Sequence, residues 1–281
     1  MKYDHYVSTD TSRTFRIHND VKRPSRLRII PPVLLTGLIL VLLAVTVDQL
    51  VGVARGGQHN PMLDGKSRTD IKAEYDFVVN GIADRRRTLY AAWQDATGTQ
   101  ARRKVVATAR TEVTRAILDE IVPYWIGTPW AFHGMTETPG SGEIACGYFV
   151  ATVLRDAGVR LDRVSLAQQP SELMIRSLVA EENIYRYSDL SGRAFLERLH
   201  RLPSGVYILG LDKHVGLLVL SESAPVFIHS SYLRPYGVVR EQAATSRALM
   251  RSRYRVLGNL TGDSSFLLKW LGGERIRTLQ E

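Results

Sequence analysis

The feature that most constrains this chain is a run of nineteen uncharged residues from Ile29 to Val47. About twenty apolar residues cross a bilayer as a helix, so we predict a transmembrane anchor over 29–50. Four basic residues precede the run, namely Lys22, Arg23, Arg26 and Arg28. The first basic residue after it is Arg55. The positive-inside rule therefore predicts a single-pass protein with a cytoplasmic N-terminus and its C-terminal domain on the other side of the membrane.

A cleaved signal peptide is the alternative interpretation of this run. The polar stretch before the run is long for a signal peptide. The residues that follow Val47 are Asp48, Gln49 and Leu50, which form no small-x-small cleavage site. The single cysteine lies far downstream, which excludes lipoprotein attachment at the end of the run. We therefore favour an uncleaved anchor.

Apolar periodicity and the positions of glycine and proline divide the chain into five predicted parts. These are a basic cytoplasmic tail (1–28), the transmembrane anchor (29–50), a linker (51–70), a helical region (71–120) and one globular domain (121–281). The helical pattern breaks near 97–99, and we expect the two helices to pack against the domain that follows. Four further stretches carry helical patterns, namely 171–180, 192–201, 247–255 and 266–271. Ser171 and Ser191 are the expected N-caps of the first two.

Charge restricts the kind of partner. The chain has 37 Lys and Arg against 28 Asp and Glu, which gives a net charge of +9. This excess indicates an anionic partner, such as a cell-envelope polymer or lipid head groups. The sequence contains no zinc-finger spacing, P-loop or RNA-binding aromatic motif, so nucleic acid is disfavoured. It leaves the oligomeric state open.

Cys146 is the only cysteine and lies between a loop rich in Gly and Pro and a helical pattern. The apolar positions of that pattern are Phe149, Val150, Val153, Leu154 and Ala157, and Gly158 is the expected helix stop. A thiol at a helix N-terminus faces unpaired N–H groups and the positive end of the dipole, which favour the thiolate. A buried inert thiol is the ordinary alternative for a lone cysteine.

Two histidines lie in β-rich runs downstream of Cys146. The runs are 206–209, 215–220 and 226–228. If the last two form a hairpin about 221–222, Leu220 pairs with Ser223 and His214 pairs with His229. Directly opposite residues have Cβ atoms about 5 Å apart, so one imidazole can act as a base toward a thiol while the other orients it. Together with Cys146, this pair favours catalysis over two half-buried strand histidines.

These residues resemble the NlpC-type cysteine peptidases, which are papain-like cell-wall enzymes of bacteria. The resemblance covers roughly 123–232. It rests on Cys146 before a helix ending in Ala-Gly, on His214-Val-Gly, on Phe-Ile-His229-Ser, and on Ile-Gly-Thr-Pro-Trp130 upstream. It implies an α+β fold in which the Cys-bearing helix packs on an antiparallel sheet. It also implies that Cys146 is the nucleophile, His214 the general base and His229 the orienting third residue.

The same resemblance implies a hydrolase of the bacterial cell envelope, anchored in the cytoplasmic (inner) membrane, with no metal or organic cofactor. Its expected substrate is an amide bond in the stem or cross-link peptides of peptidoglycan. Among the residues that depart from the family pattern, two are predicted to bind substrate. Trp130 stands where the family has a Tyr near the oxyanion site, and Tyr148 replaces a small residue beside the nucleophile and narrows the cleft.

Two alternatives remain open. The same catalytic residues are compatible with an acyl hydrolase or acyltransferase that acts on lipid or protein amides. A non-catalytic module of the cell envelope is the alternative from a different class, and retention of Cys146, His214 and His229 argues against it.

Overall fold

The computed structural model describes residues 57–280. The predicted cytoplasmic tail (1–28), the transmembrane anchor (29–50) and the first residues of the linker lie outside this described part. Within residues 57–280, no helix combines the length and the apolarity that crossing a membrane requires.

A single six-stranded antiparallel sheet forms the centre of the domain, with strand order β1-β6-β2-β3-β4-β5. Its strands are β1 (Ile184–Ser188), β2 (Gly205–Leu211), β3 (His214–Leu220), β4 (Val226–Ser231), β5 (Gly237–Gln242) and β6 (Tyr254–Asn259). The α+β class is therefore as the sequence predicts. The three predicted β-rich runs are confirmed as β2, β3 and β4, each longer than its apolar stretch.

Both faces of the sheet are buried. In β2, Val206 and Ile208 belong to one apolar cluster, whereas Tyr207 and Leu209 belong to a second. The first cluster lies under α5 (Cys146–Asp156) and α7 (Ser171–Leu178). The second lies under the short helices α8 (Gly192–Leu199) and α9 (Arg247–Arg251). Burial on two sides explains why β2 to β4 are almost continuously apolar instead of alternating with polar residues.

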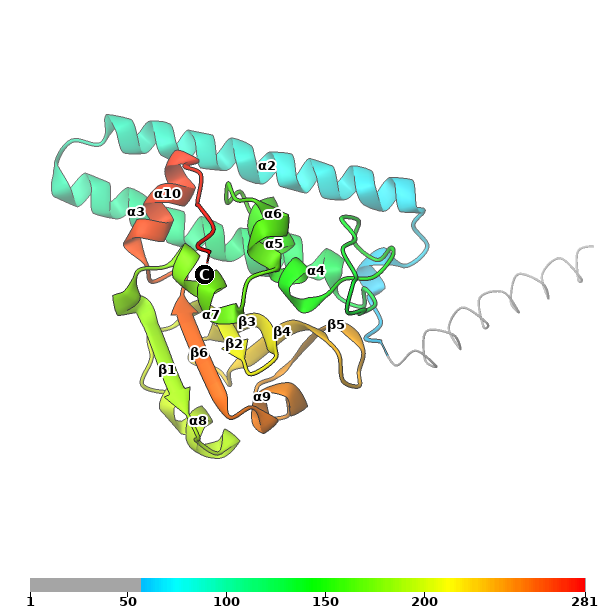
Figure 1. The fold of residues 1–281 in the computed structure, drawn as a ribbon. Helices are drawn as coiled ribbons and strands as arrows, with labels where there is room; N and C mark the ends of the chain where they lie inside the picture. Colours follow the sequence, from blue (N-terminus) through cyan, green and yellow to red (C-terminus); the bar gives the residue numbers. More distant parts are fainter. Residues whose placement is uncertain (1–56, 281) are drawn as a thin grey trace, which may run out of the picture. The chain divides into compact units, whose positions relative to one another are not determined.

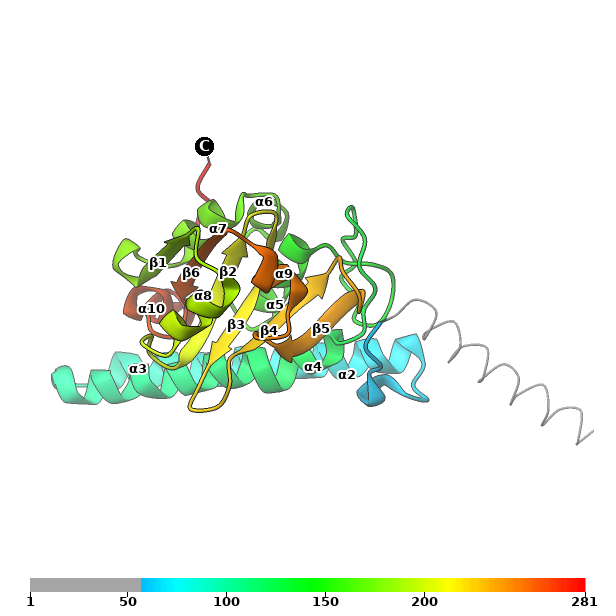
Figure 2. The same cartoon turned by 90° about the horizontal axis from the view of Figure 1, so that it is seen from below.

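A helical layer packs over the first cluster, as Figures 1 and 2 show. It consists of α2 (Arg68–Asp95), α3 (Gly98–Arg115), the π-helical η2 (Ala116–Ile121) and α4 (Val122–Trp125). Ser67 and Asp70 form a capping box at the start of α2. The expected break between the two long helices is confirmed at residues 96–97. The short connection between these two antiparallel helices lets both of them pack against the same apolar surface.

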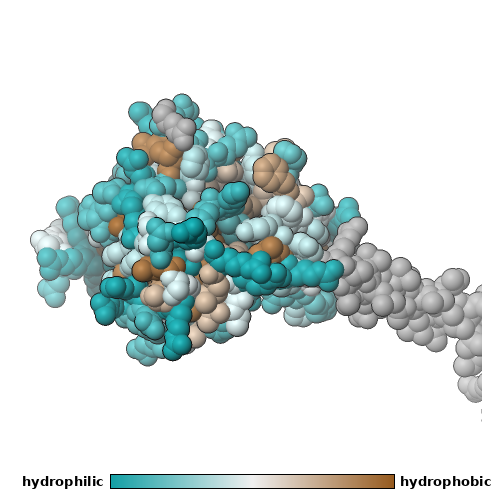
Figure 3. Space-filling view, turned by 60° about the horizontal axis from the view of Figure 1, so that its bottom comes forward, coloured by the Kyte–Doolittle hydropathy of each residue, from teal (hydrophilic) through white to brown (hydrophobic). Residues whose placement is uncertain are grey.

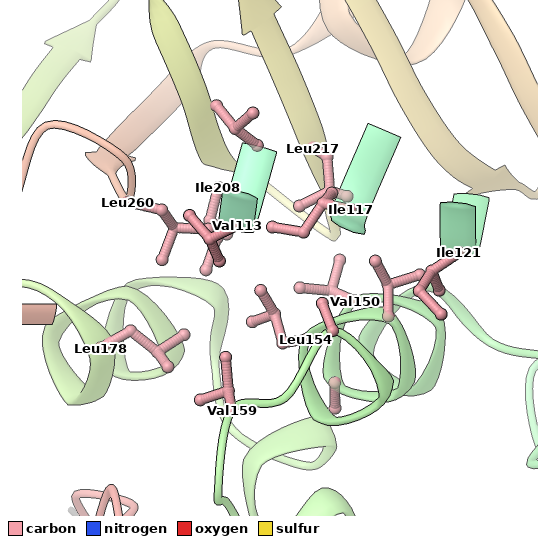
Figure 4. Packing of buried hydrophobic residues seen from close by; sticks show 14 of the residues in the cluster. Val113, Ile117, Ile121, Val150, Leu154, Val159, Leu178, Ile208, Leu217 and Leu260 are labelled. Carbon is pink, nitrogen blue, oxygen red and sulfur yellow. The ribbon is translucent and has the colours of Figure 1, made fainter. Parts of the chain in front are cut away.

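The apolar face of α3 and η2 packs against both the sheet and the Cys-bearing helix. Val113, Ile117 and Ile121 are fully buried and repeat every four residues, so they lie on one face. Figure 4 shows Ile117 beside Leu217 of β3, with Leu154 of α5 close by. Burying a side chain of this size contributes roughly 1.5–3 kcal/mol. The helical layer thereby stabilises the helix that carries the thiol.

A buried polar contact also joins the helical layer to α5. The hydroxyl of Tyr75 donates to the Asp156 carboxylate at 2.8 Å and accepts from Nε1 of Trp125 at 2.8 Å. These three side chains come from α2, α5 and α4. Buried polar atoms that all find partners fix the relative positions of the elements that carry them.

The remaining short elements bear out some expectations and correct others. Ser191 caps α8 as predicted, but the N-cap of α7 is Pro170, so Ser171 is the first helical residue and no cap. The C-terminal run packs as α10 (Ser264–Gly272), with Phe266 and Leu267 fully buried. The helix expected over 247–255 is wrong in its second half, which forms β6. The other elements are η1 (Pro61–Leu63), α6 (Arg163–Ala167) and η3 (Glu181–Asn183).

The surface seen in Figure 3 is mostly hydrophilic, with small and separate hydrophobic areas. The most exposed large apolar side chains include Phe77, Phe132 and Met135. Two of these, Phe132 and Met135, lie in the loop that leads to Cys146.

Candidate active site

Cys146 is the first residue of α5, where the sequence predicts the helix to begin. The N-cap position is Ala145, whose side chain makes no capping hydrogen bond. The first N–H groups of α5 are therefore not satisfied by a capping side chain and are available to a bound oxyanion. Gly158 has φ +93° and follows the helix end, which confirms it as the helix stop.

The loop before Cys146 is held on the sheet by backbone contacts. The N–H of Ile144 donates to the carbonyl of Pro129 at 2.8 Å, and its own carbonyl accepts from the Ser230 hydroxyl at 2.6 Å. Gly147 follows Cys146 and lies against α6, where a Cβ would collide with the carbonyl of Ala167. These contacts place the start of α5 beside the ends of β3 and β4.

The hairpin register differs from the predicted one by two residues. Leu217 pairs with Ile228, so the turn spans residues 221–225 instead of two residues, and His229 lies opposite Gly216. A two-residue shift keeps both histidines on the same face, whereas a shift of one would separate them. Gly216 has no side chain, and a Cβ there would stand only 2.7 Å from the Cβ of His229. The glycine therefore leaves the space that His229 fills.

The two imidazoles are joined as predicted, although they sit diagonally. Nε2 of His214 lies 2.7 Å from Nδ1 of His229. A third residue that sequence reasoning missed continues the row, because Nε2 of His229 lies 3.0 Å from Oε1 of Glu241 on β5. Glu241 pairs across the sheet with Phe227, whose ring stacks on His229 at 4.2 Å. The β-branched pair Val238-Val239 after the bend at 232–235 was the sequence signal for this strand.

Glu241 sets the proton positions along this row. An ionised carboxylate only accepts, so His229 donates from Nε2 and its neutral ring keeps Nδ1 unprotonated. That Nδ1 then accepts the proton of His214 Nε2. Nδ1 of His214 is left with a free lone pair. It is the only buried side-chain nitrogen or oxygen without a hydrogen-bond partner among residues 57–280.

The thiol lies beside the strand that carries His214. The backbone N–H groups of Val215, Gly147 and Cys146 lie near the sulfur and favour its charged form. Val215 packs with α5, whereas His214 projects from the other face toward Phe227, with ring centroids 6.2 Å apart. The pairing of β3 with β4 is confined to three residue pairs, from Leu217–Ile228 to Val219–Val226. His214 and Val215 lie beyond the end of this paired stretch. Within the described part of the chain, no hydrogen bond joins the thiol to either imidazole.

Burial controls the titration of the thiol and its neighbouring imidazoles. It raises the pKa of Cys146, and the hydrogen bond from the Val215 N–H only partly opposes this. Burial and the neighbouring His229 hold the pKa of His214 well below its usual value. The helix N-terminus therefore does not lower the thiol pKa as the sequence leads one to expect, because desolvation outweighs it. The resting site holds a neutral thiol and a neutral imidazole.

At Glu241 hydrogen bonding has a larger effect on the pKa than burial, whereas at Cys146 burial has the larger effect. Burial by itself raises the pKa of the carboxyl, but hydrogen bonds from His229 and Ser246 outweigh it and leave the pKa below its usual value. The same carboxylate partly offsets the effect of burial on His229, whose pKa remains lowered. Glu241 is therefore ionised near neutral pH.

The two predicted substrate-binding residues have different surroundings. Trp130 is half-buried, and its ring centroid lies 6.2 Å from that of Tyr232. Tyr232, which sequence reasoning did not assign, in turn packs edge-on against His214 at 5.2 Å. Tyr148 is buried, with the Arg163 guanidinium 4.9 Å from its ring and its hydroxyl accepting from Gln168 at 3.3 Å. A role in substrate binding stays a prediction for both.

Comparisons with known proteins add no family to this geometry. No protein-family model matches the chain, and neither a curated protein nor a solved structure matches it. The function is therefore argued below from the sequence and from the contacts around Cys146.

Proposed function

We propose that this protein is a cysteine-dependent hydrolase of amide bonds, with a papain-like core and Cys146 as its nucleophile. The observation that carries the proposal is the row Glu241–His229–His214, which ends in an unpaired Nδ1 on the residue next to Val215, whose N–H lies near the thiol. Leaving a buried imidazole nitrogen without a hydrogen bond destabilises the fold, so such a nitrogen indicates a functional role. Accepting the proton of the thiol is such a role.

In the proposed reaction, the sulfur of Cys146 bonds to the amide carbonyl carbon as its proton passes to Nδ1 of His214. That transfer runs directly or through one water, because hydrogen bonds in unliganded sites are often long. The N–H groups of Cys146 and Gly147 stabilise the oxyanion. The C–N bond then breaks, and His214 returns the proton to the leaving amine. Water cleaves the thioester, which regenerates the thiol and releases an acid.

The expected substrate is the peptide part of peptidoglycan, on a protein anchored in the bacterial inner membrane by 29–50. This part of the proposal rests on the sequence resemblance, on the net charge of +9 and on the apolar run. A neutral resting thiol is compatible with it, since a base that acts during attack does not require a preformed thiolate.

Exposed apolar side chains of the loop before Cys146 and of α6 favour a second candidate, an acyl hydrolase or acyltransferase acting on lipid or protein amides. Phe132, Met135 and Val164 are 75%, 57% and 48% exposed. The first two belong to the loop before Cys146, and Val164 belongs to α6. Nη2 of Arg163, also in α6, donates to the carbonyl of Met135 at 2.9 Å and so joins the loop to this helix. Exposed apolar side chains around one site mark a binding surface for an apolar group.

Digestion separates these candidates. The full-length protein in neutral detergent is incubated with purified peptidoglycan fragments or with N-acyl peptides, and the products are identified by mass. We expect new amine and acid termini from the peptidoglycan fragments, and none with Cys146→Ser. Cleavage of N-acyl peptides alone favours the second candidate. If neither set is cleaved and His214→Ala leaves the alkylation rate of Cys146 unchanged, the protein is a non-catalytic module.

A further inference from the structure

A basic groove lies at the end of the helical layer where α2 turns into α3. It is a cavity of about 720 Å³ whose lining includes Trp93, Arg102, Arg103, Val106, Arg110 and Ser264. We call it the arginine groove. Figure 1 shows the α2–α3 turn at the opposite end of this layer from α4. The groove is therefore separate from the site around Cys146.

The three arginines of this groove differ from four other arginines of the same helices, whose side chains all have partners. Arg85 and Arg115 form ion pairs with Glu112 and Glu120, and Arg87 pairs with Asp84. Arg86 donates to the carbonyls of Trp270 and Leu271 at the end of α10.

Within residues 57–280, no ion pair or hydrogen bond engages the guanidinium groups of Arg102, Arg103 or Arg110. All three guanidinium groups belong to residues that line the same groove, so their positive charges gather there without an anionic partner among these residues.

The acidic residue at the rim is already fully used. Asp263 adjoins Ser264, and its carboxylate accepts from the N–H of Phe266 at 2.7 Å, from the N–H of Ala180 at 2.7 Å and from Asn183 at 2.9 Å. It is 1% exposed, so it does not reach the arginines. The positive charge of the groove is consequently left for an external anion.

The shape and chemistry of the groove indicate which anion. Arg102 stacks on Trp93, with its guanidinium carbon 5.4 Å from the ring, so its fork is held in place before a ligand binds. Guanidinium forks match phosphate oxygens in bidentate geometry. Val106 and the Trp93 ring add apolar surface beside the charges. We propose that the arginine groove binds a phosphate ester, with the phosphate on the arginines and an attached organic group against Trp93.

Binding is tested on the full-length protein in neutral detergent by titration calorimetry at about 150 mM NaCl, where diffuse charge attraction is screened. One arm uses sodium pyrophosphate as the probe. The other uses micelles doped with phosphatidylglycerol, compared with phosphatidylcholine. The test variant is Arg102→Gln/Arg103→Gln/Arg110→Gln. The matched control, Arg198→Gln/Arg201→Gln/Arg251→Gln, removes the same charge from exposed positions near α8 and α9.

We expect saturable binding by the wild type, at least about tenfold weaker binding by the test variant, and less than about a twofold change in the control. Response to pyrophosphate indicates a soluble phosphate ester as the natural ligand, and response to phosphatidylglycerol alone indicates a lipid headgroup. Absence of saturable binding in both arms overturns the proposal, as does an equal loss in the control. Because the three side chains are exposed, their replacement leaves the fold intact, and an unchanged melting temperature verifies this.

Discussion

Nε2 of His229 and Oε1 of Glu241 lie 3.0 Å apart on neighbouring strands β4 and β5. This contact decides which nitrogen of each imidazole carries a proton, and so it determines that Nδ1 of His214 is the basic atom. An acidic residue outside the predicted Cys-His-His set thereby orients the base through a second ring.

We predict that Glu241→Gln lowers the rate of Cys146 alkylation at pH 7.5 by at least about tenfold, because an amide permits both His229 tautomers. Glu241→Asp retains the charge and should recover part of the loss. Rates are measured with iodoacetamide by mass spectrometry. Equal losses in Gln and Asp variants would show that Glu241 is only a packing residue.

The pKa directions predict how alkylation depends on pH. Burial raises the pKa of Cys146 and lowers that of His214, so neither group is charged near neutral pH. The labelling rate should therefore keep rising from pH 6 to above about 8.5, the usual thiol pKa, without a plateau at acidic pH. His214→Ala should lower the whole curve. A plateau between pH 5 and 7 would mean that a thiolate–imidazolium pair exists at rest.

Acid should destabilise the fold through the buried imidazoles. The pKa values of His214 and His229 lie below 6.5 in the folded state, so below pH 6.5 the unfolded chain binds more protons. The free energy of unfolding therefore decreases as the pH is lowered below 6.5, by up to about 1.4 kcal/mol per pH unit for each imidazole. Melting temperatures between pH 4.5 and 7.5 test this. His214→Gln/His229→Gln should flatten the dependence, whereas His200→Gln, at an exposed position, should leave it unchanged.

A methyl group at Gly216 should displace His229. The added Cβ would lie 2.7 Å from both the Cβ of His229 and the ring of Phe227, so we expect Gly216→Ala to cost about 1–3 kcal/mol and to slow alkylation of Cys146. The control is Gly81→Ala in α2, where the added Cβ would lie 3.4 Å from the flexible end of the Arg85 side chain. It should raise stability by about 0.5–1 kcal/mol. A neutral Gly216→Ala would contradict the close contact.

Removing the Tyr75 hydroxyl should loosen the helical layer from α5. Tyr75→Phe leaves the Trp125 N–H and Oδ2 of Asp156 without a partner, while Arg155 still donates to Oδ1 of Asp156, so the expected cost is about 1–3 kcal/mol. Tyr90→Phe is the matched control, since Tyr90 is 37% exposed. Urea unfolding measures both. If the two variants unfold at the same urea concentration, the buried contact does not stabilise the domain.

Local patterns predicted the elements that depend on neighbouring residues. The helix from Cys146 to the stop at Gly158 follows from apolar spacing, and the strands around His214 and His229 follow from their β-branched runs. The preference of serine for the N-cap position correctly predicted Ser191 as the N-cap of α8. In each case the determining contacts lie within a few residues along the chain.

Tertiary partners decided what these patterns left open. The strand β6 lies between β1 and β2, and the pairing of its Arg255 with Leu211 overrides the end of the helical pattern of 247–255. Desolvation inside the assembled core reversed the expected pKa shift of Cys146.

By itself, the sequence determined that a thiol opens a helix and that two strand histidines share a face, because helical and strand periodicity are local properties. Only the tertiary structure decided the hairpin register and brought Glu241 onto His229. Both depend on strand pairing and on a turn of five residues, which no local pattern specifies.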